Sequence, residues 1–151
     1  RAIVARAQSA VGITEEPPGS NRGLRIDEWL QRCHASTGQP WCAAFASWCL
    51  DTVAIPGALA LGGAFPATSF PRPGDVMYFP TGAGKGHCGI VAGVSGHEVM
   101  TLEGNCHDAV RCVRRARDLI RFGSTGLDTG GTCPASVVSM PFLATTTEGT
   151  R

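Results

Sequence analysis

The sequence predicts an α+β fold, in which helices come first along the chain and an antiparallel sheet follows. Two observations carry this prediction. Apolar residues recur at helical spacing in the first third of the chain, whereas short apolar segments bounded by turn residues occupy residues 74–123. The chain has 151 residues, of which 43% are hydrophobic and 17% charged, and this composition fits one domain with a substantial core.

Three helices are expected, over residues 1–12, around residues 26–33 and over residues 41–53. In the third, apolar side chains recur at the intervals that place them on one face of a helix. Pro40 stands just ahead of it, where a missing backbone N–H does no harm. Residues 55–73, rich in Gly, Ala and Pro, are expected to form a long loop.

The expected strands are residues 75–79, 87–94, 97–103, 110–117 and, less regularly, 119–122. A glycine-rich tip at residues 81–86 joins the first two, and Ser95-Gly96 forms a hairpin turn between the second and third. We therefore expect a domain over residues 1–123. Residues 124–151, rich in Gly, Thr and Ser, are expected to be an extension packed on the same domain.

Charge and hydropathy exclude two classes of partner. The formal net charge of +1 argues against nucleic acid as the main partner. No apolar run reaches the roughly 18 residues that a membrane helix needs, so we expect no membrane partner. We also expect a monomer. The sequence begins with Arg1 and shows no charged-then-apolar leader, so we expect a piece of a longer protein or a chain whose leader was removed.

The chain contains seven cysteines, at positions 33, 42, 49, 88, 106, 112 and 133. Three disulfides would leave one thiol free as a candidate nucleophile and would place the protein in an oxidising compartment, secreted, extracellular or periplasmic. The pairs expected are Cys33–Cys49, Cys88–Cys106 and Cys112–Cys133. The alternative is that several cysteines are buried thiols that pack as small apolar side chains.

Cys42 is the candidate nucleophile. It lies in the first turn of the third predicted helix, where the partial positive charge of the helix N-terminus favours thiolate over thiol. The alternative is a core cysteine on the apolar stripe. Cys49, deeper in the same helix, fits that alternative better.

His87 is the candidate base, because it opens a strand after the glycine-rich tip and a neutral imidazole can accept a thiol proton. Glu103 and Asn105 end the partner strand of the hairpin, and their spacing of two places both on one face. Either side chain can accept a hydrogen bond from the imidazole and set its tautomer. The alternatives are a surface histidine and a Gly-Asn turn.

These segments together resemble the CHAP domain, the cysteine, histidine-dependent amidohydrolase/peptidase. The resemblance covers roughly residues 3–123 and rests on P-G-S-N-R-G at residues 18–23, G-Q-P-W-C-A-A-F at 38–45, P-G-D-V at 73–76, G-H-C-G-I-V at 86–91 and T-L-E-G-N at 101–105. It implies a papain-like fold, in which the nucleophile stands at the start of a helix packed on an antiparallel sheet. Members of the family commonly cleave amide bonds in bacterial peptidoglycan.

The resemblance implies that Cys42 is the nucleophile, that His87 is the base and that Glu103 orients His87. Asn105 would polarise the site or share the role of Glu103. The function implied is that of a peptidoglycan hydrolase, either an N-acetylmuramoyl-L-alanine amidase or an endopeptidase. Peptidoglycan is then the expected partner, and a protein inhibitor or immunity protein is a second one.

Three further residues are weaker candidates for the oxyanion or substrate-binding site: Gln39, Trp41 and Asn21. Gln39 is chosen because papain-like enzymes place a glutamine upstream of the nucleophile. Asn21 lies with Glu15 in a family-like segment. Some members carry an acidic calcium loop near the start, but this chain has no comparable group of Asp residues, so we expect no metal and no cofactor.

Two other functions compete with hydrolysis. The first is a CHAP-like module that binds cell-wall peptides without cutting them. The second is a structural metal-binding domain that uses His34, His97, His107 and cysteines, although the usual ligand spacing is missing. The basic run over residues 111–121 is expected to be a solvated face of the last strands.

Overall fold

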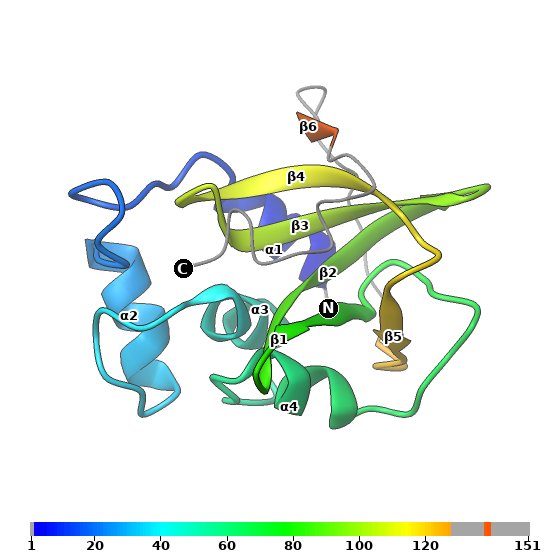
Figure 1. The fold of residues 1–151 in the computed structure, drawn as a ribbon, viewed down its shortest axis with the longest axis horizontal. Coiled ribbons are helices and arrows are strands. Elements are labelled where there is room, and N and C mark those ends of the chain that lie inside the picture. The colour runs from blue at the N-terminus through cyan, green and yellow to red at the C-terminus, as the bar shows by residue number, and fades with distance from the viewer. Residues whose placement is uncertain (1, 128–137, 140–151) are drawn as a thin grey trace.

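The protein has four helices and a six-stranded sheet, seen in a computed structural model that describes residues 2–127 and 138–139 (Figure 1). The helices are α1 (Ile3–Ser9), α2 (Leu24–Arg32), α3 (Cys42–Leu50) and α4 (Ala58–Gly63). The strands are β1 (Val76–Gly82), β2 (Lys85–Ser95), β3 (Glu98–Cys106), β4 (Ala109–Ala116), β5 (Arg121–Gly123) and β6 (Val138–Ser139). The predicted α+β class is confirmed.

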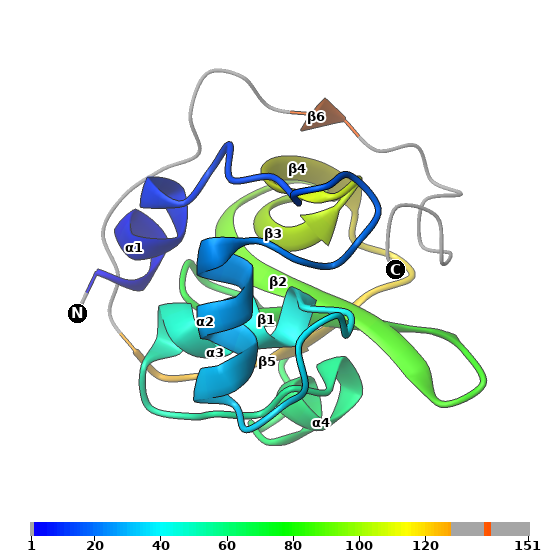
Figure 2. The same cartoon turned by 90° about the vertical axis from the view of Figure 1, so that its left-hand side faces the viewer.

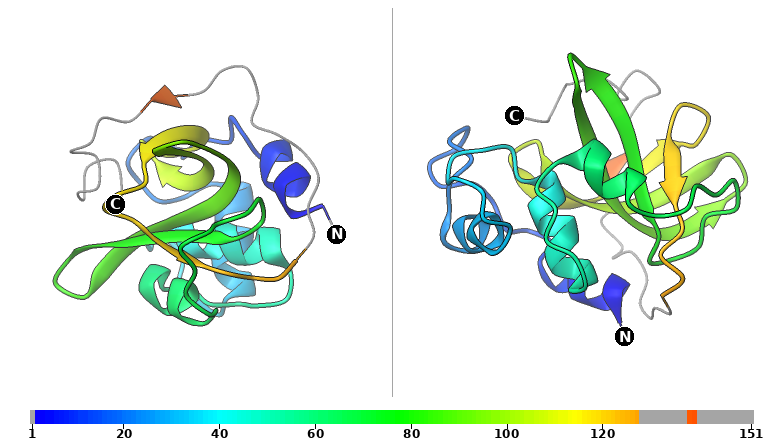
Figure 3. Two further views of the ribbon diagram at one scale, coloured as in Figure 1. Left: turned by 90° about the vertical axis from the view of Figure 1, so that its right-hand side faces the viewer. Right: turned by 90° about the horizontal axis from the view of Figure 1, so that it is seen from below.

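The sheet has the strand order β5-β1-β2-β3-β4-β6. Neighbouring strands are antiparallel except for β6, which runs parallel to β4. The hairpin of β1 and β2 projects beyond the body of the molecule (Figure 3). Within residues 2–127 and 138–139, none of the helices combines the length and the hydropathy that a membrane span requires.

Helix α3 is the centre of the helical layer. It lies between α2 and the sheet (Figure 2), and eight of its nine residues are buried. Three of them are alanines, at positions 43, 44 and 46, and such small side chains allow the sheet to approach the helix closely. A helix that is apolar all round must be buried on every side, and this position satisfies that requirement.

The sheet has a core on each face. Cys88, Ile90 and Leu102 belong to the large cluster that the helices cover. Met77 and Phe79, which alternate with helix-facing residues along β1, belong to a smaller cluster on the other face together with residues of β2, β3 and the β5 region. A side chain on the sheet is therefore assigned to one core or the other by its parity along the strand.

The predicted helices and strands are confirmed, with ends that differ by a few residues. The segment 55–73 differs in kind, because it contains α4 rather than only loop. Its two glycines hid the helix from sequence reasoning, since Gly lowers helix propensity. Gly62 is needed there because α4 lies directly against the ring of Tyr78.

Two of the predicted disulfides are wrong, because Cys33, Cys49, Cys88 and Cys106 are all free and buried. Burial raises the pKa of the Cys33 thiol while Ser47 acts to lower it, and burial raises the pKa of the Cys49 thiol while Arg6 of α1 acts to lower it. In the sheet, Ile90 pairs with Leu102, so the register places Cys88 nearest to residue 104. The alternative of buried thiols holds for these four residues.

Most of the predicted extension over residues 124–151, and Cys133 with its expected bond to Cys112, lie outside the described residues. Of the described part, Thr125 donates its backbone N–H to Asp75 Oδ1 at 3.0 Å. Its hydroxyl also donates to the carbonyl of Gly74 at 3.0 Å. These contacts attach the residues after β5 to the start of β1.

Replacing Gly62 by Ala is expected to destabilise the protein. The added Cβ would lie 2.2 Å from the Tyr78 ring, and such overpacking typically costs about 1–3 kcal/mol. The matched control is Gly63→Ala in the same helix, where nothing in the described chain lies within 4 Å of the added Cβ. Urea unfolding should rank Gly63→Ala at or above the parent and Gly62→Ala below it; equal stability of the two variants contradicts the packing.

Candidate active site

Cys42 is the first residue of α3, and its side chain meets β2. The helix begins there with the first bond from the Phe45 N–H to the Trp41 carbonyl, at 3.0 Å. The Cys42 thiol interacts with His87 and Cys88, which are consecutive on β2. The structure therefore brings together the predicted thiol and the predicted imidazole.

His87 and Glu103 form a buried pair across β2 and β3. His87 Nε2 lies 2.6 Å from Glu103 Oε1, and the two side chains are 1% and 0% exposed. Because Nε2 is held by the carboxylate, Nδ1 is the ring nitrogen left for proton exchange with Cys42. The ring of His87 also lies against that of Phe79, with centroids 5.6 Å apart.

Glu103 has two further partners, neither of which was chosen from the sequence. Arg115 donates from Nε to Oε2 and from Nη2 to Oε1, both at 2.7 Å. Thr101 Oγ1 donates to Oε2 at 2.5 Å. Both oxygens of the carboxylate are thus bonded twice, and a bidentate charge-assisted pair of this kind is strong and directional.

Arg115 contradicts the expectation that the basic run is a solvated face, because its side chain is only 4% exposed. Sequence reasoning missed it since the run mixes arginines on both faces of β4. The available signal was the isolated acid: a buried Glu103 requires a cation nearby. Arg111 and Arg114 in the same run remain partly exposed.

The surroundings of Cys42 favour its thiolate. A hydrogen bond from the Cys88 thiol is the largest influence, and together with His87 it lowers the pKa of Cys42 well below its usual value, although burial acts to raise it. The same bond and burial raise the pKa of Cys88. Cys88 therefore stays a protonated thiol that donates to Cys42, a contact that sequence reasoning did not foresee.

The surroundings of His87 favour its imidazolium. Burial lowers the pKa of His87, but Glu103 and Cys42 raise it by more, to about 9. Burial acts to raise the pKa of Glu103, but Arg115 and, to a smaller extent, His87 lower that pKa by more than burial raises it. The carboxylate therefore stays ionised. The site therefore holds four charged groups that contact one another in turn: the Cys42 thiolate, the His87 imidazolium, the Glu103 carboxylate and the Arg115 guanidinium.

Two glycines of the predicted motifs make room for this arrangement. A Cβ on Gly89 would lie 2.7 Å from Glu103 Cγ and 2.9 Å from the Leu102 carbonyl oxygen. A Cβ on Gly104 would lie 2.7 Å from Phe45 Cβ. Gly89 thus admits the carboxylate beside His87, and Gly104 admits α3 against β3.

Asn105 is buried near the end of β3, two residues after Glu103. It has a left-handed backbone with φ of 54° and lies where the register of β3 and β4 shifts, between Glu103 and Cys106. A spacing of two places side chains on one face only where a strand is regular, and this part of β3 is irregular.

A buried carboxylate connects the first loop to the start of α3. Glu15 is 2% exposed and accepts the Trp41 indole N–H at 2.9 Å and the Asn21 backbone N–H at 3.0 Å. Asn21 Nδ2 in turn donates to the Gly38 carbonyl at 3.3 Å. Trp41 is 0% exposed, so its ring belongs to the core, and Asn21 holds the segment that leads into Cys42.

The cleft above Cys42 has a volume of about 800 Å³. Its lining comes from residues 35–40, Cys42, residues 56–60 and the hairpin tip between Thr81 and Gly86. Gln39, the predicted oxyanion donor, is among the lining residues. Lys85 is the one charged side chain in this lining. The loop and the hairpin tip therefore shape the space available to a substrate.

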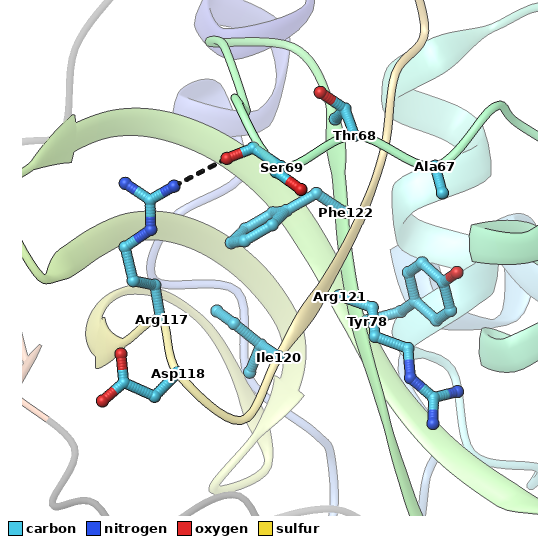
Figure 4. Close-up of a pocket in the computed structure, with 9 residues that line it drawn as sticks. All are labelled: Ala67, Thr68, Ser69, Tyr78, Arg117, Asp118, Ile120, Arg121 and Phe122. Carbon is cyan, nitrogen blue, oxygen red and sulfur yellow. Dashed lines mark hydrogen bonds between the residues drawn. The ribbon is translucent and has the colours of Figure 1, made fainter.

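A second cavity, of about 510 Å³, lies beside β5 and contains none of the predicted site residues (Figure 4). Its lining includes Tyr78, Arg117, Arg121 and Phe122, and Arg117 donates to the Ser69 carbonyl at 2.9 Å.

In the described part of the chain, no group of three His, Cys, Asp or Glu side chains is placed to hold a metal ion.

Replacing Trp41 by Phe is expected to leave Glu15 with an unmet hydrogen bond and to destabilise the protein. Trp29→Phe is a matched control, because Trp29 is equally buried and its indole N–H has no partner among the described residues. The Trp41 variant should lose about 1–3 kcal/mol more than the control. Chemical unfolding measures the difference, and equal losses would rule out a stabilising bond to Glu15.

Comparison with known proteins finds one family whose model matches the part of the chain that holds the site. Residues 34–105 match the family model of the CHAP domain, a family of cysteine, histidine-dependent amidohydrolases and peptidases. The matched segment contains Cys42, His87, Glu103 and Asn105 and ends before Arg115. No curated protein and no solved structure matches the chain. The resemblance to the CHAP domain is therefore confirmed over residues 34–105.

Proposed function

We propose that this protein is a peptidoglycan hydrolase that cleaves an amide bond of the bacterial cell wall through Cys42, His87 and Glu103. The observation that carries the proposal is the buried contact of His87 with Glu103 at 2.6 Å, beside a thiol whose pKa is lowered by its neighbours. A cell-wall-binding module has no need of an activated thiol. The wall as substrate comes from the CHAP family match.

The reaction proceeds by acyl transfer in two steps. The Cys42 thiolate attacks the amide carbonyl carbon; the S–C bond forms, and the C–N bond breaks as His87 gives its proton to the leaving amine. Water then attacks the thioester, His87 takes a proton from that water, and the thiolate leaves as the acid product forms. Atoms and protons balance over the cycle, and Glu103 keeps the imidazole in one orientation throughout.

The negative oxygen formed on the carbonyl needs donors. The backbone N–H groups at the start of α3 point out of the helix end and are suited to this role. Gln39 lines the same cleft and is the second candidate donor.

Peptidoglycan lies outside the cytoplasmic membrane, so we propose that the protein acts there. The expected inhibitor and the monomeric state stay predictions.

The decisive experiment is digestion of purified peptidoglycan, with release of soluble fragments followed by turbidity and new amine and carboxyl ends identified by mass spectrometry. Cys42→Ala and His87→Ala should each lose about a thousandfold or more of the activity. Activity of Cys42→Ala equal to the parent rejects the proposal.

Labelling with iodoacetamide separates the enzyme from the binding module, because an activated thiol is alkylated faster than an ordinary one. Cys42 should be labelled first at pH 6–7. Cys106 is the internal control, since burial raises the pKa of its thiol to about 12. Equal rates at the two positions, together with wall binding but no cleavage, would favour the binding module.

The pH profile of kcat/KM is expected to be a broad bell. The reactive state requires the Cys42 thiolate, which is present above the lowered pKa of Cys42, and the His87 imidazolium, which is lost as pH rises through about 9. Activity should therefore persist below pH 7 and fall on the alkaline side near pH 9. A profile that keeps rising through pH 10 would contradict the imidazolium assignment.

A further inference from the structure

Arg115 reaches the site from a strand that carries none of the predicted catalytic residues. It lies on β4 opposite Val99 of β3, and its guanidinium extends along the sheet face to Glu103. Its Cζ lies 5.1 Å from the centre of the Phe79 ring, the same ring that contacts His87. Arg115 and His87 therefore enclose Glu103 and share one aromatic wall.

The bonds to Glu103 leave its carboxylate a single orientation. Oε1 accepts from His87 Nε2 and from Arg115 Nη2, while Oε2 accepts from Arg115 Nε and from Thr101 Oγ1. Rotation about the bond to the carboxylate would break the two-point pairing with the planar guanidinium. The direction in which Oε1 faces His87 is thus set by Arg115.

From this geometry we infer that Arg115 is a positioning residue of the proposed site: it fixes the carboxylate that orients His87, and its positive charge limits how strongly Glu103 favours the imidazolium form of His87. The inference rests on the proposed function, because it is the imidazolium that gives its Nδ1 proton to the leaving amine. No residue outside Cys42, His87, Glu103 and Asn105 was assigned such a role by the family resemblance.

The charge effect follows from where the groups lie. Two charged or titratable side chains act on His87 directly: Glu103 from β3 and Cys42 from α3. Arg115 from β4 acts on His87 through Glu103. Cys88 follows His87 in the chain, and Cys106 lies near Glu103. A lone buried carboxylate would favour the imidazolium more strongly than one already paired with a cation. Arg115 thus keeps His87 acidic enough to donate.

The test is a titration of His87 by NMR in the full chain carrying Cys42→Ala, with the signal assigned by its loss in His87→Asn. Arg115→Met removes the charge, so His87 should titrate about one unit or more higher than in the Cys42→Ala parent. Thr101→Val is the control, because it removes one uncharged donor to Glu103; it should leave the titration within about half a unit. An unmoved titration in Arg115→Met overturns the charge effect.

Arg115→Lys tests positioning and keeps the experiment decisive if Arg115→Met does not fold. The lysine retains the charge but lacks the planar fork. His87 should then titrate within about half a unit of the parent, while kcat on peptidoglycan falls about tenfold or more with little change in KM. Full kcat in Arg115→Lys overturns the positioning role.

The two proposals fail separately. The titrations need no substrate, so a chain that shows the expected shifts but does not cut peptidoglycan would refute the proposed function and leave the effect of Arg115 on His87 standing. A chain that cuts peptidoglycan with an unshifted titration in Arg115→Met and full kcat in Arg115→Lys would refute the inference alone.

Discussion

A carboxylate with no exposed surface must be balanced by positive charge, and Glu103 is balanced on two sides. Arg115 supplies a permanent cation and His87 supplies one that can release its proton. Burial makes each of these interactions strong, because little water competes for the charges. It also makes each of them necessary, since a buried acid with one partner removed would carry an uncompensated charge. The rest of the site is arranged around this pair.

The polar network lies where the two layers of the fold meet. Cys42 comes from α3, which packs on the large core, whereas Phe79, which contacts His87 and Arg115, belongs to the smaller core on the other face of the sheet. Small residues allow the two layers to meet: alanines on α3, Gly104 against Phe45 and Gly89 beside Glu103. The close packing of the helix on the sheet and the reach of the imidazole to the thiol are therefore one structural requirement.

The cysteines illustrate how environment separates residues of one type. Burial raises the pKa of the Cys49 thiol, which is enclosed in the core, whereas Cys42 at the start of the same helix has its pKa lowered by Cys88 and His87. One helix thus carries an inert thiol and a reactive one two turns apart. Position along the helix matters less than the donors that the neighbouring strand presents.

Local periodicity and motifs along the chain are enough to predict the fold class, most of the helices and strands, and the thiol and imidazole that meet. The folded chain alone shows what depends on strand register and parity. It placed Arg115 inside rather than in solvent, turned Cys88 toward Cys42 rather than Cys106, and buried Trp41 on Glu15. A buried charge or donor selects its partner through space, and residues 12 or 26 positions apart in the chain carry no local sign of that choice.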